Sequence, residues 1–360
     1  MLLLFSSYLF VFHVLSTPLD ICVRNYQNCE ACVNSTDIFG QRCVWCITNN
    51  RCGTIQSIEC DSDDATLHVY NCPGDVNNFI YDEQFMREIA TPLIASTNAP
   101  NMEILSSVLN SCFKDNANVY NTYEIFCDED NVTTCYAYSV YLKRENAFAM
   151  IFRGTSTIFQ LIDEGISFFL RRKVDFLETG GVVDSYYLNG FRNLWKRNLK
   201  RDFETLYNRN PDANFWFFGH SLGGGLASIG SMMIQKKYNI PKNQVKLVTF
   251  GMPRIGDIEL AMAHDEAIPD SIRIVNSRDP IPALPPRTYP DTINSGSFHH
   301  SREVWYPNGM SQGAVYIIGN RPDTNIGRSL IPFNIDHHFK YFDAVLEDWY
   351  KTGCRKITIN

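Results

Sequence analysis

One short segment combines residue types that could supply a nucleophile, namely Gly219-His220-Ser221-Leu222-Gly223. The apolar run at residues 214–218 predicts a strand before it, and the small-residue stretch at 222–237 predicts a helix after it. A serine on such a strand-to-helix turn has strained backbone geometry, and the flanking glycines let strand and helix approach closely. Free N–H groups at the start of a helix favour an anion. We therefore expect Ser221 to be the nucleophile and the Leu222 N–H to bind an oxyanion.

A serine nucleophile needs a histidine base that a carboxylate orients. On this kind of turn the chain order is serine, then acid, then histidine. Asp279 follows the expected strand 271–276, at its carboxyl end, and is the favoured acid. Asp257 follows the preceding expected strand and is the main alternative, although it could instead cap the next helix. Further competitors are Asp265, Asp270 and Asp291.

Five histidines follow Ser221 in the chain. His264 precedes the strand that leads to Asp279, so chain order disfavours it as the base. His299 and His300 lie in a loop before the apolar run 302–306, where they could help to shape the site. His337 and His338 open an expected apolar C-terminal helix. Adjacent histidines point in different directions, so one of this pair would serve, and the pattern alone leaves the choice open.

The composition limits the classes of function. The 360 residues are 45% hydrophobic with a formal net charge of −7, which suits about two globular domains and gives no attraction to nucleic acid. Residues 1–16 form an apolar run of signal-peptide length, and no later segment is long and apolar enough to span a bilayer. We expect a secreted, extracellular protein without an integral membrane span.

The cysteines are concentrated near the start of the chain, within an expected small module at residues 17–74. Disulfides are favoured there because the module is too short to be held by its core alone, although two Cys-x-x-Cys pairs leave zinc as the alternative. Two sequons, at Asn34 and Asn131, could carry glycans. The cysteines of the module are Cys22, Cys29, Cys32, Cys43, Cys46, Cys52, Cys60 and Cys72.

The remainder, residues 78–360, has the texture of an α/β domain. Strands are expected at 136–142, 147–152, 214–218, 245–250 and 271–276, and helices at 79–95, 186–207 and 222–237. Strands that alternate with helices predict a mostly parallel sheet with helices on its faces. Cys127 and Cys135 flank a short loop and are expected to pair, which leaves Cys112 and Cys354 to each other by elimination.

Resemblances to two known protein families add to these predictions. The steps Cys29-Glu-Ala-Cys32, Cys43-Val-Trp-Cys46 and Cys52 resemble the PSI (plexin-semaphorin-integrin) module, which implies a structural or spacing role. The second region resembles the fungal-type, class 3 triacylglycerol lipases, which have an α/β-hydrolase fold. That resemblance rests on five motifs in the family order: Ile151-Phe-Arg-Gly-Thr155, Gly219-His-Ser-Leu-Gly-Gly224, Val248-Thr-Phe-Gly-Met-Pro-Arg254, Ile274-Val-Asn-Ser-Arg-Asp279 and His338-Phe-Lys-Tyr-Phe342.

The class 3 resemblance implies the remaining roles. The base would be His338, the acid Asp279, and Thr155 would join Leu222 in the oxyanion hole. The stretch after Thr155 would be a helical lid over an apolar cleft, unless it is a buried core helix. The implied activity is hydrolysis of lipid esters at a lipid–water interface through an acyl-enzyme, with no cofactor or metal. Phospholipase A1 or polar esterase activity on the same residues, or an inactive lipid-binding or adhesion protein, are the alternatives.

Overall fold

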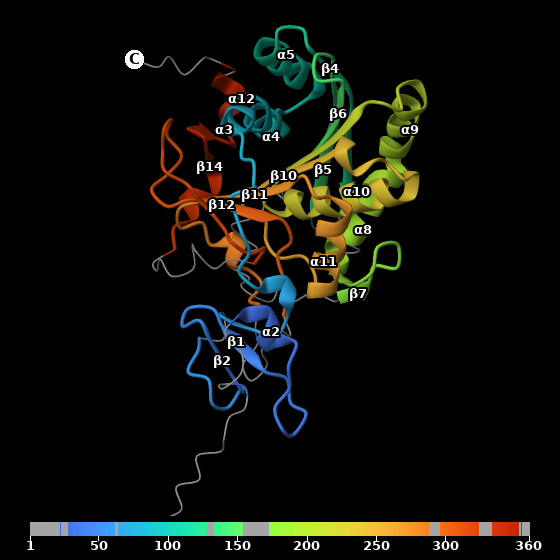
Figure 1. Cartoon of the computed structure of the whole chain (residues 1–360). Helices are drawn as coiled ribbons and strands as arrows, with labels where there is room; N and C mark the ends of the chain where they lie inside the picture. Colours follow the sequence, from blue (N-terminus) through green and yellow to red (C-terminus); the bar gives the residue numbers. More distant parts are fainter. Residues whose placement is uncertain are drawn as a thin grey trace, which may run out of the picture. The chain divides into compact units, whose positions relative to one another are not determined.

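The computed structural model describes residues 22, 28–61, 64–127, 133–153, 173–287, 296–323, 333–352 and 354. The chain divides into two compact units, Met1–Cys72 and Pro73–Asn360 (Figure 1). The expected signal segment lies outside the described residues.

The first unit is organised by disulfides. It contains a short helix α2 (Cys29–Val33) and a three-stranded antiparallel sheet in the order β2 (Arg51–Gly53), β1 (Val44–Cys46), β3 (Ala65–Thr66), followed by η1 (Val69–Asn71). All eight cysteines of the module are bonded, and five of them (Cys22, Cys29, Cys32, Cys43 and Cys52) form a small buried core with Val33 and Trp45. The bonds are Cys22–Cys43, Cys29–Cys72, Cys32–Cys52 and Cys46–Cys60. None of these sulfurs is therefore available to bind zinc.

An eight-stranded sheet forms the centre of the second unit, in the order β13-β12-β11-β10-β9-β6-β5-β4. Five neighbouring strands, from β6 to β12, are parallel, and β4, β5 and β13 are antiparallel to their neighbours. This confirms the expected α/β fold with a mostly parallel sheet. The strands are β4 (Ala117–Phe126), β5 (Thr134–Leu142), β6 (Ala147–Arg153), β9 (Asn214–His220), β10 (Val245–Phe250), β11 (Ser271–Asn276), β12 (Arg302–Tyr306) and β13 (Ile317–Ile318).

Alternating side chains of the central strands build two separate cores. In β9, Phe215 and Phe217 belong to one core, and Trp216 and Phe218 belong to the other, because successive side chains point to opposite faces. Helices α8 (Ser185–Leu194), α9 (Lys200–Arg209), α10 (Leu222–Tyr238) and α11 (Ile258–Ala267) cover the first face. Helices α3 (Glu83–Phe85), α4 (Thr91–Ala95) and α5 (Met102–Phe113) cover the other (Figure 1). The site residues are therefore held on a sheet with both faces buried.

Two of the expected helices are continuous but locally widened. The helix expected at 79–95 begins later, at Glu83, and contains the π-helical turn η2 (Met86–Ala90) between α3 and α4, with η3 (Ser96–Asn98) after α4. The helix expected at 186–207 contains η4 (Trp195–Leu199). Smaller elements complete the unit: β7 (Lys173–Asp175), β8 (Val182–Asp184), η5 (Lys242–Gln244), η6 (Ile281–Ala283), η7 (Ile335–Phe339), β14 (Lys340–Tyr341), β15 (Ala344–Val345) and α12 (Trp349–Thr352).

The prediction that His337 and His338 open an apolar C-terminal helix is wrong. Both histidines lie in the short 3-10 helix η7, and the chain continues into β14. The apolar residues at 338–342 are buried without a helix, because Tyr341 and Phe342 pack into the second core of the sheet. Among the described residues, no helix combines the length and the apolar character needed to cross a membrane.

Candidate active site

Ser221 lies between the end of β9 and the first residue of α10, with backbone angles φ 56° and ψ −130°. Positive φ is strained for a residue with a side chain, so the surrounding packing must impose it. The neighbouring glycines show how: a Cβ on Gly219 would lie 2.2 Å from the Gly223 carbonyl oxygen, and one on Gly223 would lie 2.3 Å from that of Phe152. The sharp turn therefore depends on both glycines. Leu222 is the first residue of α10, where N–H groups lack partners within the helix.

His338 and Asp279 are joined in the structure. The His338 Nδ1 lies 3.0 Å and 2.9 Å from the two carboxylate oxygens of Asp279, and both side chains are fully buried. Because a carboxylate accepts, the Nδ1–H of the ring donates, and the Nε2 of the neutral ring is left as an acceptor. The Tyr341 hydroxyl also donates to Asp279, at 2.8 Å, and burial followed by the carboxylate charge raises the pKa of Tyr341 well above its usual value.

Two atoms of this group are buried without hydrogen-bond partners within the described part of the chain: the Ser221 Oγ and the His338 Nε2. Buried polar atoms normally have partners, so such a pair is unusual. The residue before Ser221 connects the two, because the His220 Nε2–H donates to the His338 carbonyl at 2.7 Å and the two rings lie 4.5 Å apart. Desolvation, followed by the proximity of His338, lowers the pKa of His220 well below its usual value, so His220 is neutral.

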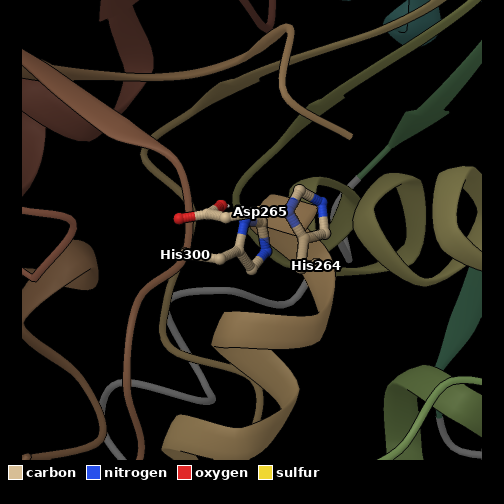
Figure 2. Close-up of side chains that lie close together, drawn as sticks. All are labelled: His264, Asp265 and His300. Atoms are coloured by element: carbon tan, nitrogen blue, oxygen red, sulfur yellow. Dashed lines mark hydrogen bonds and ion pairs between the residues drawn. The ribbon is translucent and has the colours of Figure 1, made fainter. Parts of the chain in front are cut away.

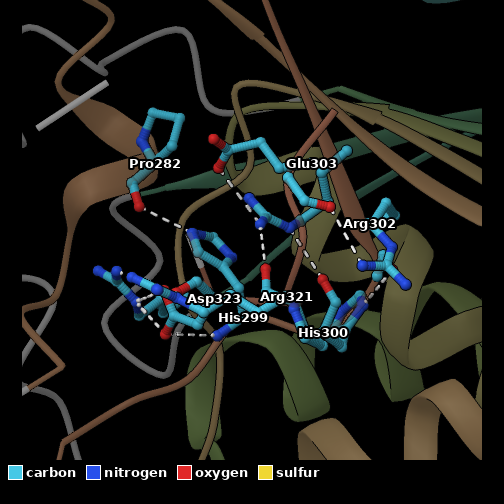
Figure 3. Close-up of polar contacts among 12 residues, drawn as sticks. Pro282, His299, His300, Arg302, Glu303, Arg321 and Asp323 are labelled. Carbon is cyan, nitrogen blue, oxygen red and sulfur yellow. Dashed lines mark hydrogen bonds and ion pairs between the residues drawn. The ribbon is translucent and has the colours of Figure 1, made fainter. Parts of the chain in front are cut away.

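The loop that carries Asp279 is fixed by a network of buried polar groups. The Ile281 N–H donates to Asp279, and the His299 Nε2–H donates to the Pro282 carbonyl at 2.7 Å (Figure 3). Arg254, from the loop after β10, donates to the carbonyls of Ala283 and Pro285. Its ion pair with Asp323 at 2.7 Å outweighs the effect of burial and holds the pKa of that carboxyl well below its usual range. His299 therefore shapes the site through this loop.

The competing carboxylates have other partners. Asp257 caps α11 by accepting from the Leu260 N–H, and it also accepts from the Val182 N–H. Asp265 accepts from the Ser301 N–H, and Asp270 pairs with Lys246 at 2.6 Å. Asp291 lies outside the described residues. Among the described candidates, Asp279 alone lies against His338.

A second serine–histidine pair lies deeper in the fold. The Ser228 Oγ, in the middle of α10, is 2.7 Å from the His300 Nε2, and the His300 Nδ1 is 2.6 Å from the Ser301 Oγ. Ser271 donates to the Ser301 Oγ, so these hydroxyls and the ring form one buried chain of hydrogen bonds. In a nucleophile–base pair a carboxylate orients the histidine. The His300 Nδ1 instead contacts a serine hydroxyl.

His300 also belongs to a cluster with His264 and Asp265, residue types that bind metals (Figure 2). The two imidazole rings are stacked, with centroids 3.5 Å apart and planes inclined by 20°. A ring nitrogen binds a metal in the plane of its ring, so stacked rings do not direct two nitrogens at one ion. Both His300 nitrogens are also hydrogen-bonded. The cluster does not fit a metal site.

Three predicted features lie outside the described residues: Thr155, the apolar stretch after it, and Asn131. The apolar residues of that stretch are Ile158, Phe159, Leu161, Ile162, Ile166, Phe168, Phe169 and Leu170. Asn34 is exposed at the end of α2. Disulfides join Cys127 to Cys135 and Cys112 to Cys354.

A cavity of about 810 Å³ lies next to the loops that carry the acid and the base, but Asp279, His338 and Ser221 do not line it. It is lined by Arg278, which precedes Asp279, and by His337, which precedes His338. The His337 Nδ1 accepts from the Arg278 N–H at 3.1 Å, so His337 ties the two loops together. Sequence reasoning did not assign roles to His220, His337 or Tyr341, although His220 and Tyr341 stand inside the motifs that it used.

Comparisons with known proteins decide the family. Residues 149–289 match the family described as Lipase (class 3). The lipase ZK262.3 of Caenorhabditis elegans is 30% identical over 266 residues, which cover 67% of this chain and 74% of the relative. The chain belongs to the class 3 lipase family. A class 3 lipase is a carboxylic ester hydrolase, and this chain is one.

Fungal relatives match shorter parts. The secreted mono- and diacylglycerol lipase MDL3 of Malassezia globosa is 30% identical over 36% of this chain and 41% of its own length. The chain thus spans less than half of that class 3 relative. Among solved structures, the Rhizopus microsporus var. chinensis lipase has a TM-score of 0.61 at 20% identity, covering 75% of this chain and 91% of that protein. The Rhizomucor miehei triacylglyceride lipase has the same TM-score and identity, covering 74% and 97%. These likenesses show the shared fold.

Proposed function

We propose that this class 3 lipase hydrolyses triacylglycerols, with Ser221 as nucleophile, His338 as general base and Asp279 as the group that orients His338. Ser221 attacks the ester carbonyl while the His338 Nε2 takes its proton. The protonated ring then gives that proton to the departing alcohol, and water releases the fatty acid from the acyl-enzyme. The observation that carries the proposal is the His338–Asp279 bond, which leaves the buried Nε2 as an acceptor without a partner among the described residues, as the buried Oγ of the strained Ser221 also is.

The oxyanion would be bound by backbone N–H groups. Leu222 supplies one from the start of α10, where the helix dipole also favours negative charge. The motif Ile151-Phe-Arg-Gly-Thr155 contains the proposed second donor, Thr155, which follows the last residue of β6, Arg153, by two positions in the sequence. Since β6 and β9 are parallel neighbours, their carboxyl ends lie at the same edge of the sheet.

Tyr341 and His220 are proposed to position the pair. Tyr341 holds one oxygen of Asp279, and His220 holds the backbone of His338. A neutral His220 adds no positive charge beside the imidazolium that forms during the reaction.

The proposed setting is extracellular. Six disulfides among the described cysteines suit an oxidising compartment, and relatives from Malassezia globosa and Fusarium solani are named as secreted lipases. Cleavage of residues 1–16 as a signal peptide, glycans on Asn34 and Asn131, a PSI-type first unit and a mobile lid after Thr155 belong to the same proposal.

A substrate panel tests the activity. Purified protein is assayed on triacylglycerol emulsions, phospholipid vesicles and a short soluble ester, each beside Ser221→Ala protein prepared in the same way. We expect the fastest hydrolysis on the emulsion and none above background for the variant. Preference for vesicles would replace the proposal with phospholipase A1 activity. Preference for the soluble ester would replace it with polar esterase activity.

A further inference from the structure

One turn of the first unit carries two large apolar side chains into solvent. Ile38 is 66% exposed and Phe39 is 79% exposed, although they are adjacent in a disulfide-bonded unit with few core residues to spare. Single exposed apolar residues are ordinary, but two bulky neighbours at the tip of one turn are a candidate contact surface. We call residues 37–41 the apolar tip.

The apolar tip is held in one conformation. An antiparallel bridge between Thr36 and Arg42 closes its base. Cys32 and Cys43, on the two sides of that base, are bonded to Cys52 and Cys22. A surface that is ordered before it binds loses little conformational entropy on binding.

The backbone of the apolar tip is unusually well satisfied for an exposed turn. The Asp37 carboxylate accepts from the N–H groups of Phe39 and Gln41, both at 2.8 Å. The Asp37 carbonyl accepts from Gly40, and the Asp37 N–H donates to the Gln41 carbonyl. Most N–H groups of the turn would therefore keep their partners if the tip left water, which removes the cost of desolvating unpaired backbone groups.

The charges next to the apolar tip are also engaged. Asp37 is occupied by the turn itself, and Arg42 donates to the Leu67 carbonyl at 2.6 Å. No further charged residue lies between Thr36 and Arg42. A surface that offers apolar side chains and little free charge is complementary to a neutral, apolar lipid phase and does not match an anionic partner.

We propose that the apolar tip is an interfacial anchor, in which Ile38 and Phe39 insert into the surface of a neutral lipid phase and hold the enzyme on its substrate. The inference rests on the proposed function for the presence of a lipid phase. It gives the first unit a role that the catalytic residues do not require.

Adsorption to lipid droplets tests the anchor without hydrolysis. Triolein droplets coated with phosphatidylcholine are mixed with full-length protein in the Ser221→Ala background, so that the lipid is not consumed, and bound protein is measured after flotation. The double variant Ile38→Ser, Phe39→Ser should bind at least about tenfold more weakly, because burial of each side chain contributes a factor of about this size. Ile55→Ser, which removes another exposed apolar residue of the same unit, should bind as the parent does.

Further variants keep the test decisive. Phe39→Trp should retain adsorption in the presence of Ile38, because tryptophan suits a lipid–water boundary. Single serine variants with all cysteines oxidised replace the double variant if it fails to fold. Asn34→Gln removes any glycan near the base of the tip and should leave adsorption equal or stronger. Equal adsorption of the tip variants and of Ile55→Ser would overturn the proposal and assign the tip to a protein partner.

Hydrolysis assays distinguish a failure of the anchor from a failure of the proposed function. In the active background, tip variants should keep the parent rate on a short soluble ester and lose rate on droplets. An active parent whose tip variants hydrolyse droplets at the parent rate would overturn the anchor alone. A parent that hydrolyses no ester would overturn the proposed function, while adsorption would still report on the anchor.

Discussion

Two sets of serine, histidine and aspartate lie in the second unit, and their hydrogen bonds distinguish them. Ser221, His338 and Asp279 form an open set, in which the serine oxygen and the Nε2 of the ring have no partner within the described chain. Ser228, His300 and Asp265 form a closed set, in which the serine oxygen and both ring nitrogens are hydrogen-bonded. We therefore assign the same residue types to catalysis in one place and to packing in the other.

The difference comes from the elements that carry the serines. Ser221 precedes α10 at a strained turn, whereas Ser228 lies about two turns inside the helix, where backbone N–H groups are already bonded. Strain and unpaired atoms destabilise a fold and persist at functional sites. The predictions below test this contrast between an open and a closed set.

The largest contrast is expected between the two serines. Ser221→Ala should lower kcat by about 10⁴-fold or more, because the step that forms the acyl-enzyme is removed. Ser228→Ala should keep activity and lose about 1–2 kcal/mol of unfolding free energy, because it leaves the buried His300 Nε2 without a partner. Labelling by a fluorophosphonate probe, read beside urea unfolding, measures both. Strong labelling of Ser221→Ala together with loss of labelling in Ser228→Ala would reverse the assignment.

The acids should differ in the same way. Asp279→Asn should lower kcat by about 10⁴-fold, because an amide no longer fixes the tautomer in which the His338 Nε2 accepts. Asp265→Asn, in the closed set, is the matched control and should keep kcat within a few-fold while the Ser301 contact weakens. Steady-state rates on a soluble ester provide the measurement. Comparable losses in the two variants would show that the closed set also takes part in catalysis.

Much of the open set could be predicted from the sequence, because its signals are local. The glycines around Ser221 indicate the sharp turn, and β-branched and aromatic runs indicate the strands that precede Ser221 and Asp279. The choice of His338 over His337 needed the family motif, since spacing does not tell which of two neighbours is buried.

The closed set and the form of the C-terminal segment were not predictable in this way. Ser228 and His300 meet across 72 residues of sequence, and no local pattern reports such a contact. The segment at 338–342 shows helical apolar spacing, but tertiary packing of Tyr341 and Phe342 determines its structure. The apolar tip was missed because Ile38 and Phe39 look like core residues until their exposure is known.

Gly251 tests how tightly the open set is packed. A Cβ there would lie 2.7 Å from the Asp279 Oδ2 and 2.9 Å from the His338 Cε1, and φ is +58°. Gly251→Ala should lower kcat/KM by about 10²-fold, because small displacements of reacting groups are costly. Gly313→Ala shares the positive φ (+77°) without any close neighbour, so it should lose some stability and retain activity. Equal kinetics in the two variants would mean that the open set tolerates displacement.

His220 should have a smaller effect than these groups. His220→Leu removes the donor to the His338 carbonyl and should lower kcat by about tenfold with little change in KM, because the ring of His338 would be less well placed. His220→Gln retains a donor and should recover part of the loss. A purely structural role would instead lower the unfolding free energy in both variants and leave kcat of the folded fraction unchanged, which titration of active sites would reveal.

The smallest expected effect is the pH dependence of the unfolding free energy that His300, in the closed set, contributes. Burial, followed by the neighbouring His264 and Arg273, lowers the pKa of His300 well below its usual value of about 6.5. The unfolded chain therefore binds a proton that the folded chain excludes, so the stability contributed by neutral His300 is present above about pH 6.5 and is lost as the pH falls below it. His299 and His220, whose pKa values are also lowered by burial, act in the same direction.

In urea unfolding at pH 7 and pH 5, His300→Gln should lose less stability on acidification than the parent, by about 1 kcal/mol for each pH unit below 6.5. The same loss in both proteins would contradict the closed, uncharged state of this histidine.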